Sequence, residues 1–204
     1  MNDLHRALDE IGSIRRQVAR TTEFRGYGPA TLAATAVFAA LAAVAQARWL
    51  PDPAASVSTY LATWITTAVL SAALIGTQMF ARTRRIHSGL ADEMIRTAVE
   101  QFLPAAAAGA LVTVVIVYRV PQALWMLPGL WLLTFSLGVF ASCRFLPRPM
   151  ALAGVWYLST GLLAIALAGP RAFSPWIMGI SYGIGQLLVA AILFFNRGEA
   201  GDAL

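Results

Sequence analysis

The sequence predicts an all-α polytopic membrane protein with six transmembrane helices arranged as three hairpins. The chain of 204 residues is 58% hydrophobic, against about 45 to 50% in soluble domains, and its mean hydropathy is +0.67. Charged residues bound six long uncharged runs, each near the roughly 20 residues that a helix needs to cross about 30 Å of hydrocarbon. Helices are required because backbone groups in lipid must pair within their own segment.

The uncharged runs predict the spans in order along the chain. They are expected at residues 28–48, 57–80, 101–118, 122–142, 149–168 and 174–195, all within a transmembrane domain of residues 26–197. The third span is the shortest, and Pro104 is expected in its first turn, where a missing backbone N–H costs little.

The remaining segments are expected in the cytoplasm. Residues 1–25 carry apolar side chains at three- and four-residue spacing, which predicts an amphipathic helix before the first span. A second amphipathic helix is expected to lead into the third span, over residues 86–102. Residues 198–204 form a short cytoplasmic tail in this prediction.

The arginines predict the orientation. All 15 basic residues are Arg, and Ala, Gly and Pro are abundant, which is typical of a high-GC bacterial genome. With the N-terminus inside, only three arginines, each near a proline, lie outside: Arg48, Arg119 and Arg171. This bias predicts both termini in the cytoplasm and a bacterial inner-membrane location. Trp49, Trp125 and Trp176 are expected in the outer headgroup layer.

The expected spans lack the side chains of membrane catalysis. Ionisable groups inside a bilayer mark proton relays and ion paths, and none lies inside the six spans. The two histidines, His5 and His87, fall in cytoplasmic segments, and Cys143 is the single cysteine. Haem ligation, zinc binding within the spans and general acid–base chemistry all need such groups. The sequence therefore predicts no enzyme, no cofactor and no metal site.

Uncharged polar side chains are the candidate functional groups. They are Thr63, Thr67, Ser71 and Gln78 in the second span, and Tyr182 and Gln186 in the sixth. Gly179 and Gly183 share one helix face with Tyr182 and Gln186, and small residues of this kind allow close helix packing. The polar groups either make ordinary helix contacts, which is the favoured interpretation, or line a narrow polar path.

The cytoplasmic arginines are expected to contact anionic lipid headgroups. The candidates are Arg15, Arg16, Arg82, Arg84 and Arg85. Their two amphipathic helices either lie on the inner leaflet, dock a protein partner or pack against the helix bundle. A homo-oligomer is a further alternative, and no nucleic-acid partner is expected, because the basic residues sit at the ends of apolar runs.

Four strings carry a resemblance to a known group of proteins: Glu23-Phe-Arg-Gly-Tyr-Gly-Pro29, Gln101-Phe-Leu-Pro104, Leu124-Trp-Met-Leu-Pro-Gly-Leu-Trp131 and Phe140-Ala-Ser-Cys-Arg-Phe-Leu-Pro147. Together they resemble an uncharacterised family of small six-helix bacterial membrane proteins. The resemblance covers most of the chain and implies no activity. The general plan is also similar to six-helix solute channels such as acid-gated urea channels, but their selectivity residues are absent and the expected orientation is opposite.

These features predict a non-catalytic integral inner-membrane protein that acts through protein or lipid partners, as a membrane subunit, sensor or scaffold. The alternative is a channel or carrier for a small neutral solute. A third and minor alternative is a reaction on a lipid at the inner membrane border, where His87, Asp92, Glu93 and Glu100 fall.

Overall fold

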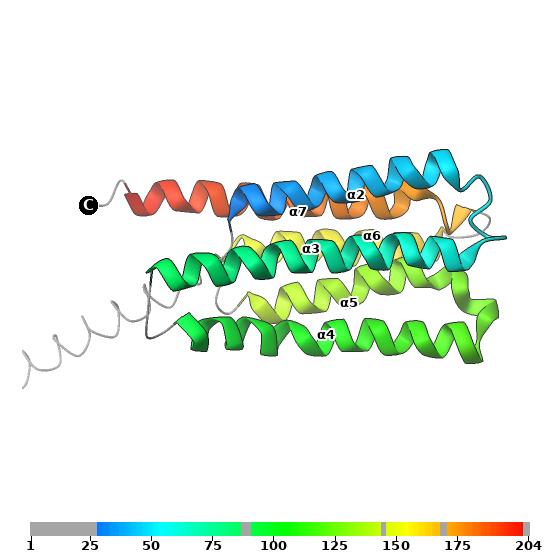
Figure 1. Ribbon diagram of the computed structural model, residues 1–204, viewed down its shortest axis with the longest axis horizontal. Coiled ribbons are helices and arrows are strands. Elements are labelled where there is room, and N and C mark those ends of the chain that lie inside the picture. Colours follow the sequence, from blue (N-terminus) through cyan, green and yellow to red (C-terminus); the bar gives the residue numbers. More distant parts are fainter. Residues whose placement is uncertain (1–27, 87–90, 144–145, 168–170, 202–204) are drawn as a thin grey trace, which may run out of the picture.

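The computed structural model describes residues 28–86, 91–143, 146–167 and 171–201 (Figure 1). Over these ranges the chain forms six α-helices and one short 3-10 helix, with no strand. They are α2 (Pro29–Trp49), α3 (Val57–Ile86), α4 (Ala91–Arg119), η1 (Pro121–Met126), α5 (Leu127–Ser142), α6 (Met150–Ala166) and α7 (Pro175–Gly201). The predicted all-helical class is confirmed. The expected amphipathic helix over residues 1–25 lies outside the described residues.

Five segments are long and apolar enough to cross a membrane. They are Pro29–Trp49, Val57–Ala81, Val99–Arg119, Pro121–Ser142 and Pro175–Asn196. The remaining expected span, the fifth at residues 149–168, corresponds to α6, which has 17 residues and a length of about 26 Å at 1.5 Å per residue. This length is below the roughly 30 Å of hydrocarbon. The structure therefore supports a helical membrane protein with five long candidate spans, and the crossing by α6 stays a prediction.

Prolines define where several of these helices begin. A proline occupies one of the first two positions of α2, η1 and α5, and α7 starts at Pro175. The first helical residue has no intrahelical partner for its N–H, so proline costs nothing there and its ring presets the helical φ angle. The local sequence therefore sets the start of each of these elements.

Pro104 is different, and the expectation that it lies in a first turn is wrong. The helix that contains it begins at Ala91, so Pro104 lies inside α4. The expected cytoplasmic helix and the third span form one continuous helix from Ala91 onward. Similarly, α7 continues past the predicted boundary at residue 197 to Gly201. Figure 1 shows α3, α4 and α7 extending beyond the other helices on the side of the C-terminus.

The six α-helices form a ring. Going around it, the neighbours are α3, α2, α7, α6, α5 and α4, and α4 closes the ring against α3. The closest pairs are α2 with α7 and α5 with α6. A Cβ built at Gly179 of α7 would lie 2.5 Å from the Cβ of Ala43 in α2. Small residues permit this close approach, which is how membrane helices gain packing energy.

The ring is packed unevenly. In the spans of α2, η1–α5 and α7, between 39 and 44% of residues are buried, but only 11% are buried in α3 and in α4. The tightest packing therefore lies along α2, α7, α6 and α5, while α3 and α4 form a loosely packed edge.

Candidate functional site

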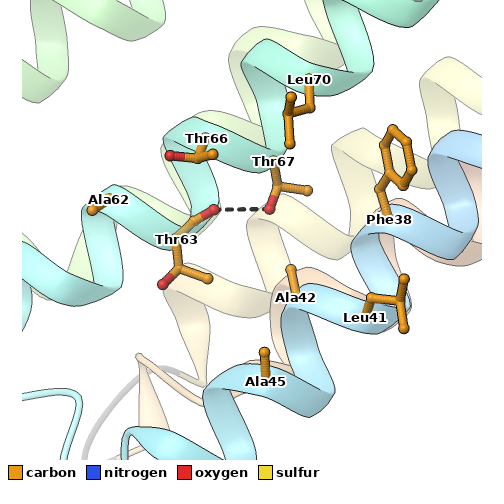
Figure 2. Close-up of a pocket in the computed structure, with 9 residues that line it drawn as sticks. All are labelled: Phe38, Leu41, Ala42, Ala45, Ala62, Thr63, Thr66, Thr67 and Leu70. Atoms are coloured by element: carbon orange, nitrogen blue, oxygen red, sulfur yellow. Dashed lines mark hydrogen bonds between the residues drawn. The ribbon is translucent and has the colours of Figure 1, made fainter.

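A groove of about 530 Å³ lies between α2 and α3 (Figure 2). Its lining combines large apolar side chains with alanines and threonines: Phe38, Leu41, Ala42, Ala45, Ala62, Thr63, Thr66, Thr67 and Leu70. Figure 2 shows the bulky Phe38 and Leu70 near one end of the groove and Ala45 toward the other. Two of the sequence-predicted polar residues, Thr63 and Thr67, thus line this groove.

The hydroxyls of Thr63 and Thr67 in the groove bond to their own helix. Thr67 Oγ1 donates to the carbonyl of Thr63 at 2.8 Å, and Thr63 Oγ1 donates to the carbonyl of Thr59 at 2.9 Å. Such i−4 bonds satisfy a hydroxyl proton in an apolar surrounding. Each hydroxyl oxygen keeps lone pairs that can accept a hydrogen bond from a neighbouring helix.

The other two predicted side chains of this helix lie further along α3. The backbone N–H of Gly28 donates to Gln78 Oε1 at 3.2 Å, so Gln78 joins α3 to the start of α2. A Cβ built at Gly28 would lie 2.5 Å from that oxygen, so a larger residue here would require the Gln78 amide to shift. Ser71 is half-buried.

A buried hydrogen-bond network that the sequence analysis missed joins three segments. Gln46 of α2 is only 2% exposed. Its Oε1 accepts from Trp64 Nε1 of α3 at 2.7 Å, and its Nε2 donates to the carbonyl of Phe173, before α7, at 2.7 Å. A signal existed in the sequence, because Gln46 continues the face of Ala39 and Ala43 at three- and four-residue spacing.

Two buried tyrosines in the interior of the ring were also missed. Tyr60 and Tyr157 are both fully buried, and their hydroxyl oxygens have no hydrogen-bond partner among the described residues. The Tyr60 ring lies 4.9 Å from that of Phe173 and 6.5 Å from that of Trp131, measured between ring centroids. A buried polar group without a partner costs about 1 to 3 kcal/mol, and buried tyrosines usually find one.

Tyr157 belongs to an aromatic cluster formed with α5 and α7. Its ring centroid lies 4.7 Å from that of Phe135 and 5.5 Å from that of Tyr182, and the rings of Phe135 and Tyr182 are 5.3 Å apart. Tyr157 packs directly on Gly185, where an added Cβ would overlap the phenol. The sequence-predicted Tyr182 therefore faces α5 and α6.

The structure assigns different surroundings to the remaining predicted residues of α7. Gln186 is 8% exposed. Gly179 lies against Ala43 of α2, whereas a Cβ built at Gly183 would meet no atom within 4 Å. The threonines of α3 line the groove with α2, while Tyr182 lies in the aromatic cluster with α5 and α6. The two sets of predicted polar groups thus belong to two separate places.

Other predicted contacts fall outside the described part of the chain. Arg15 and Arg16 do so entirely, as do the side chains of Arg82, Arg84 and Arg85. Cys143 directly follows α5; its Sγ donates to the carbonyl of Val139 at 3.3 Å, and burial raises the pKa of the thiol. Within the described ranges, no group of three or more His, Cys, Asp or Glu side chains could hold a metal ion.

Comparisons with known protein families, with curated proteins and with solved structures found no match to this chain. The family resemblance of the four sequence strings therefore stays a prediction.

Proposed function

We propose that this chain is a non-catalytic, six-span protein of the bacterial inner membrane that binds a transmembrane helix of a partner protein in the groove between α2 and α3. The observation that carries the proposal concerns α3. It is the least apolar of the five long candidate spans, yet only 11% of it is buried. Lipid favours contact with the most apolar surfaces. The exposed face of this less apolar helix is therefore better covered by another helix than by lipid.

The lining of the groove supports a helix as the occupant. Ala42, Ala45 and Ala62 leave room for a second backbone to approach, and small residues are enriched where membrane helices meet. The hydroxyl oxygens of Thr63 and Thr67 can accept hydrogen bonds from that helix. The partner helix expected here presents Gly, Ala, Ser or Thr on its contact face.

The orientation in this proposal follows the arginines and the aromatic residues. Trp49 is 82% exposed, and Trp125 and Trp176 are also exposed, as suits residues of an outer headgroup belt. The proposal has α6 as the remaining span, accommodated by local thinning of the bilayer around its shorter length. Both termini are then cytoplasmic.

Photo-crosslinking in native membranes tests the proposal. A benzophenone amino acid is placed at Thr66, in the groove, and at Leu162, an exposed apolar position of α6. We expect a defined protein adduct from Thr66 and lipid adducts from Leu162. Replacing Ala62 with phenylalanine fills the groove and should abolish the protein adduct. Lipid adducts alone at Thr66 would refute the proposal, and an adduct with a second copy would assign the groove to self-association.

A channel or carrier for a small neutral solute is the second candidate function. The observation that favours it is the presence of Thr63 and Thr67 in the lining of the groove between α2 and α3, because hydroxyl groups along a pore can replace the water around a passing solute. Proteoliposomes that pass acetamide or glycerol no faster than protein-free vesicles would remove this candidate.

A further inference from the structure

Two arginines, Arg48 and Arg171, are carried by segments that a hydrogen bond joins. The Gln46 side chain of α2 donates from Nε2 to the carbonyl of Phe173 at 2.7 Å. Arg48 follows Gln46 by two residues, and Arg171 precedes Phe173 by two residues. The end of α2 and the start of α7 lie at the same end of the helix ring (Figure 1). The two arginines are far apart in the sequence but belong to one junction of the fold.

The backbone on both sides of this junction is anchored, while the two arginine side chains are exposed. The last turn of α2 closes with the N–H of Leu50 donating to the carbonyl of Gln46 at 2.9 Å. The carbonyl of Arg171 accepts from the N–H of Ser174 at 2.9 Å, and Ala172 is only 4% exposed. The two guanidinium groups therefore extend from a fixed base.

Little acidic charge is available at this end of the helices. Asp52 is the only acidic residue within residues 29–91, and residues 101–198 contain none. Its Oδ1 accepts from the N–H groups of Ala54 and Ala55, both at 3.1 Å, so this carboxylate is engaged before α3. The junction carries more positive than negative charge and favours an anionic ligand.

The ends of the two helices treat the two arginines differently. Arg48 lies in the last turn of α2, where the helix dipole favours a cation. Arg171 precedes α7, which starts at Pro175, and the N-terminal end of a helix favours an anion instead. An anion at the junction would be stabilised by both guanidinium groups and by the start of α7. Arg171 is therefore better explained by such a ligand than by the helix ends.

Exposed aromatic and apolar side chains identify the ligand as a lipid. Trp49 is 82% exposed and Trp176 is 52% exposed, and indole rings prefer the headgroup level of a bilayer. One helical turn further from this end, Val44 and Ile180 expose apolar side chains, as contact with acyl chains requires. The anion found at such a depth is the phosphate of a lipid, to which a guanidinium group can donate two parallel hydrogen bonds.

We propose that Arg48 and Arg171, flanked by Trp49 and Trp176, bind the headgroup of an anionic phospholipid. The acyl chains of this lipid run along the exposed apolar side chains of α2 and α7. The site is separate from the groove between α2 and α3 and does not depend on the proposed helix partner. It is also independent of the direction in which the chain crosses the membrane.

Native mass spectrometry of the full chain, purified in detergent and titrated with lipid, tests this site. The probes are phosphatidylglycerol, which is anionic, and phosphatidylcholine, whose choline group balances the phosphate charge. We expect phosphatidylglycerol to bind at least about fivefold more tightly. Arg48→Gln and Arg171→Gln should each weaken its binding by about fivefold, and the double variant by about 25-fold, the order expected of one and two arginines near an anionic surface.

Two other exposed arginines provide matched controls. Arg119 lies at the end of α4 beside Tyr118, which is 78% exposed, but it does not belong to the junction of α2 and α7. Arg148 precedes α6, at the opposite end of the ring. Arg119→Gln and Arg148→Gln should each change the affinity for phosphatidylglycerol by less than about twofold. Because all four arginines are exposed, glutamine should leave the helical content unchanged, which circular dichroism checks.

Several results would overturn the proposal. They are equal affinities of the wild type for the two lipids, an unchanged affinity in the double variant, and an equal loss in either control variant. Inorganic phosphate offers the same phosphate chemistry without acyl chains, so displacement of the lipid by it would also contradict a lipid site. If the chain extracted from native membranes carries a protein that the double variant loses, with its lipid complement unchanged, the arginines bind a protein and the lipid assignment is wrong.

Discussion

Replacing Gln46 with leucine removes the network that joins α2, α3 and the segment before α7. The substitution keeps a similar side-chain volume but deletes both hydrogen bonds, each of 2.7 Å. The indole N–H of Trp64 and the carbonyl of Phe173 each lose this partner. Because Gln46 is only 2% exposed, bulk water cannot replace the amide without local opening of the packing.

The expected loss of stability follows from what such bonds contribute in membranes. Interhelical hydrogen bonds average about 0.6 kcal/mol in measured cases and reach about 1.7 kcal/mol. Two of them predict that Gln46→Leu lowers the free energy of unfolding by about 1 to 3 kcal/mol. Trp64→Phe removes one of the same bonds and some ring contact. Its effect and that of Gln46→Leu should therefore be coupled by about 0.6 to 1.7 kcal/mol.

The measurement is the free energy of unfolding in bicelles for wild type, both single variants and the double variant. Thr63→Val is the matched control, because the Thr63 hydroxyl lies one residue from Trp64 and bonds only within α3; its effect should stay within about 0.5 kcal/mol. If the Gln46 and Trp64 effects add with a coupling below about 0.3 kcal/mol, which is the error of additivity, the reasoning about this network is refuted.

Three further predictions use the same protein preparation. Gly185→Ala should lower the free energy of unfolding by about 1 to 3 kcal/mol, because the new Cβ overlaps Tyr157. Gly183→Ala is the control: its Cβ meets no atom within 4 Å, so it should be neutral or stabilising by up to about 1 kcal/mol. Equal effects of the two variants would contradict the close packing of Tyr157 on Gly185. Pro104→Ala should raise the free energy of unfolding, by up to about 3 kcal/mol, because it restores a donor inside α4; an unchanged or lower value would argue against this. Cys143 should react with maleimide more slowly than glutathione does at pH 7.5, because its raised pKa leaves less thiolate near neutrality. Its reaction rate should approach that of glutathione as the pH rises to 9.5. Equal rates for the two thiols at pH 7.5 would count against burial of the Cys143 thiol.

The sequence by itself determined the helices and most of their boundaries. The first span was expected at residues 28–48, and a helical segment long and apolar enough to be one runs over Pro29–Trp49; the last was expected at 174–195, and such a segment runs over Pro175–Asn196. The physical reason is local, because a backbone in lipid must satisfy its own hydrogen bonds and the charges and prolines at the borders end the runs. Residue types along the chain are enough to identify both the apolar runs and the residues that end them.

The tertiary structure alone decided which faces of the helices meet. Gln46 bonds to Phe173, 127 residues away, and Tyr157 packs on Gly185 across two helices. A soluble protein reveals its inner faces by their apolar pattern, but in lipid the outer face of a helix is as apolar as the inner one. The sequence therefore left open whether the polar groups of two spans make ordinary helix contacts or share one path, while the structure places Thr63 and Thr67 in the groove with α2 and Tyr182 in the aromatic cluster with α5 and α6.

The sequence is similarly uninformative about where a helix ends beyond the hydrocarbon. The sequence predicted a cytoplasmic helix over residues 86–102 before the third span. That this helix continues into the span without a break, which places Pro104 in the interior of α4, emerged only from the structure. Residue types along one segment set its conformation, whereas the depth, length and neighbours of that segment depend on contacts with helices that are distant in the chain.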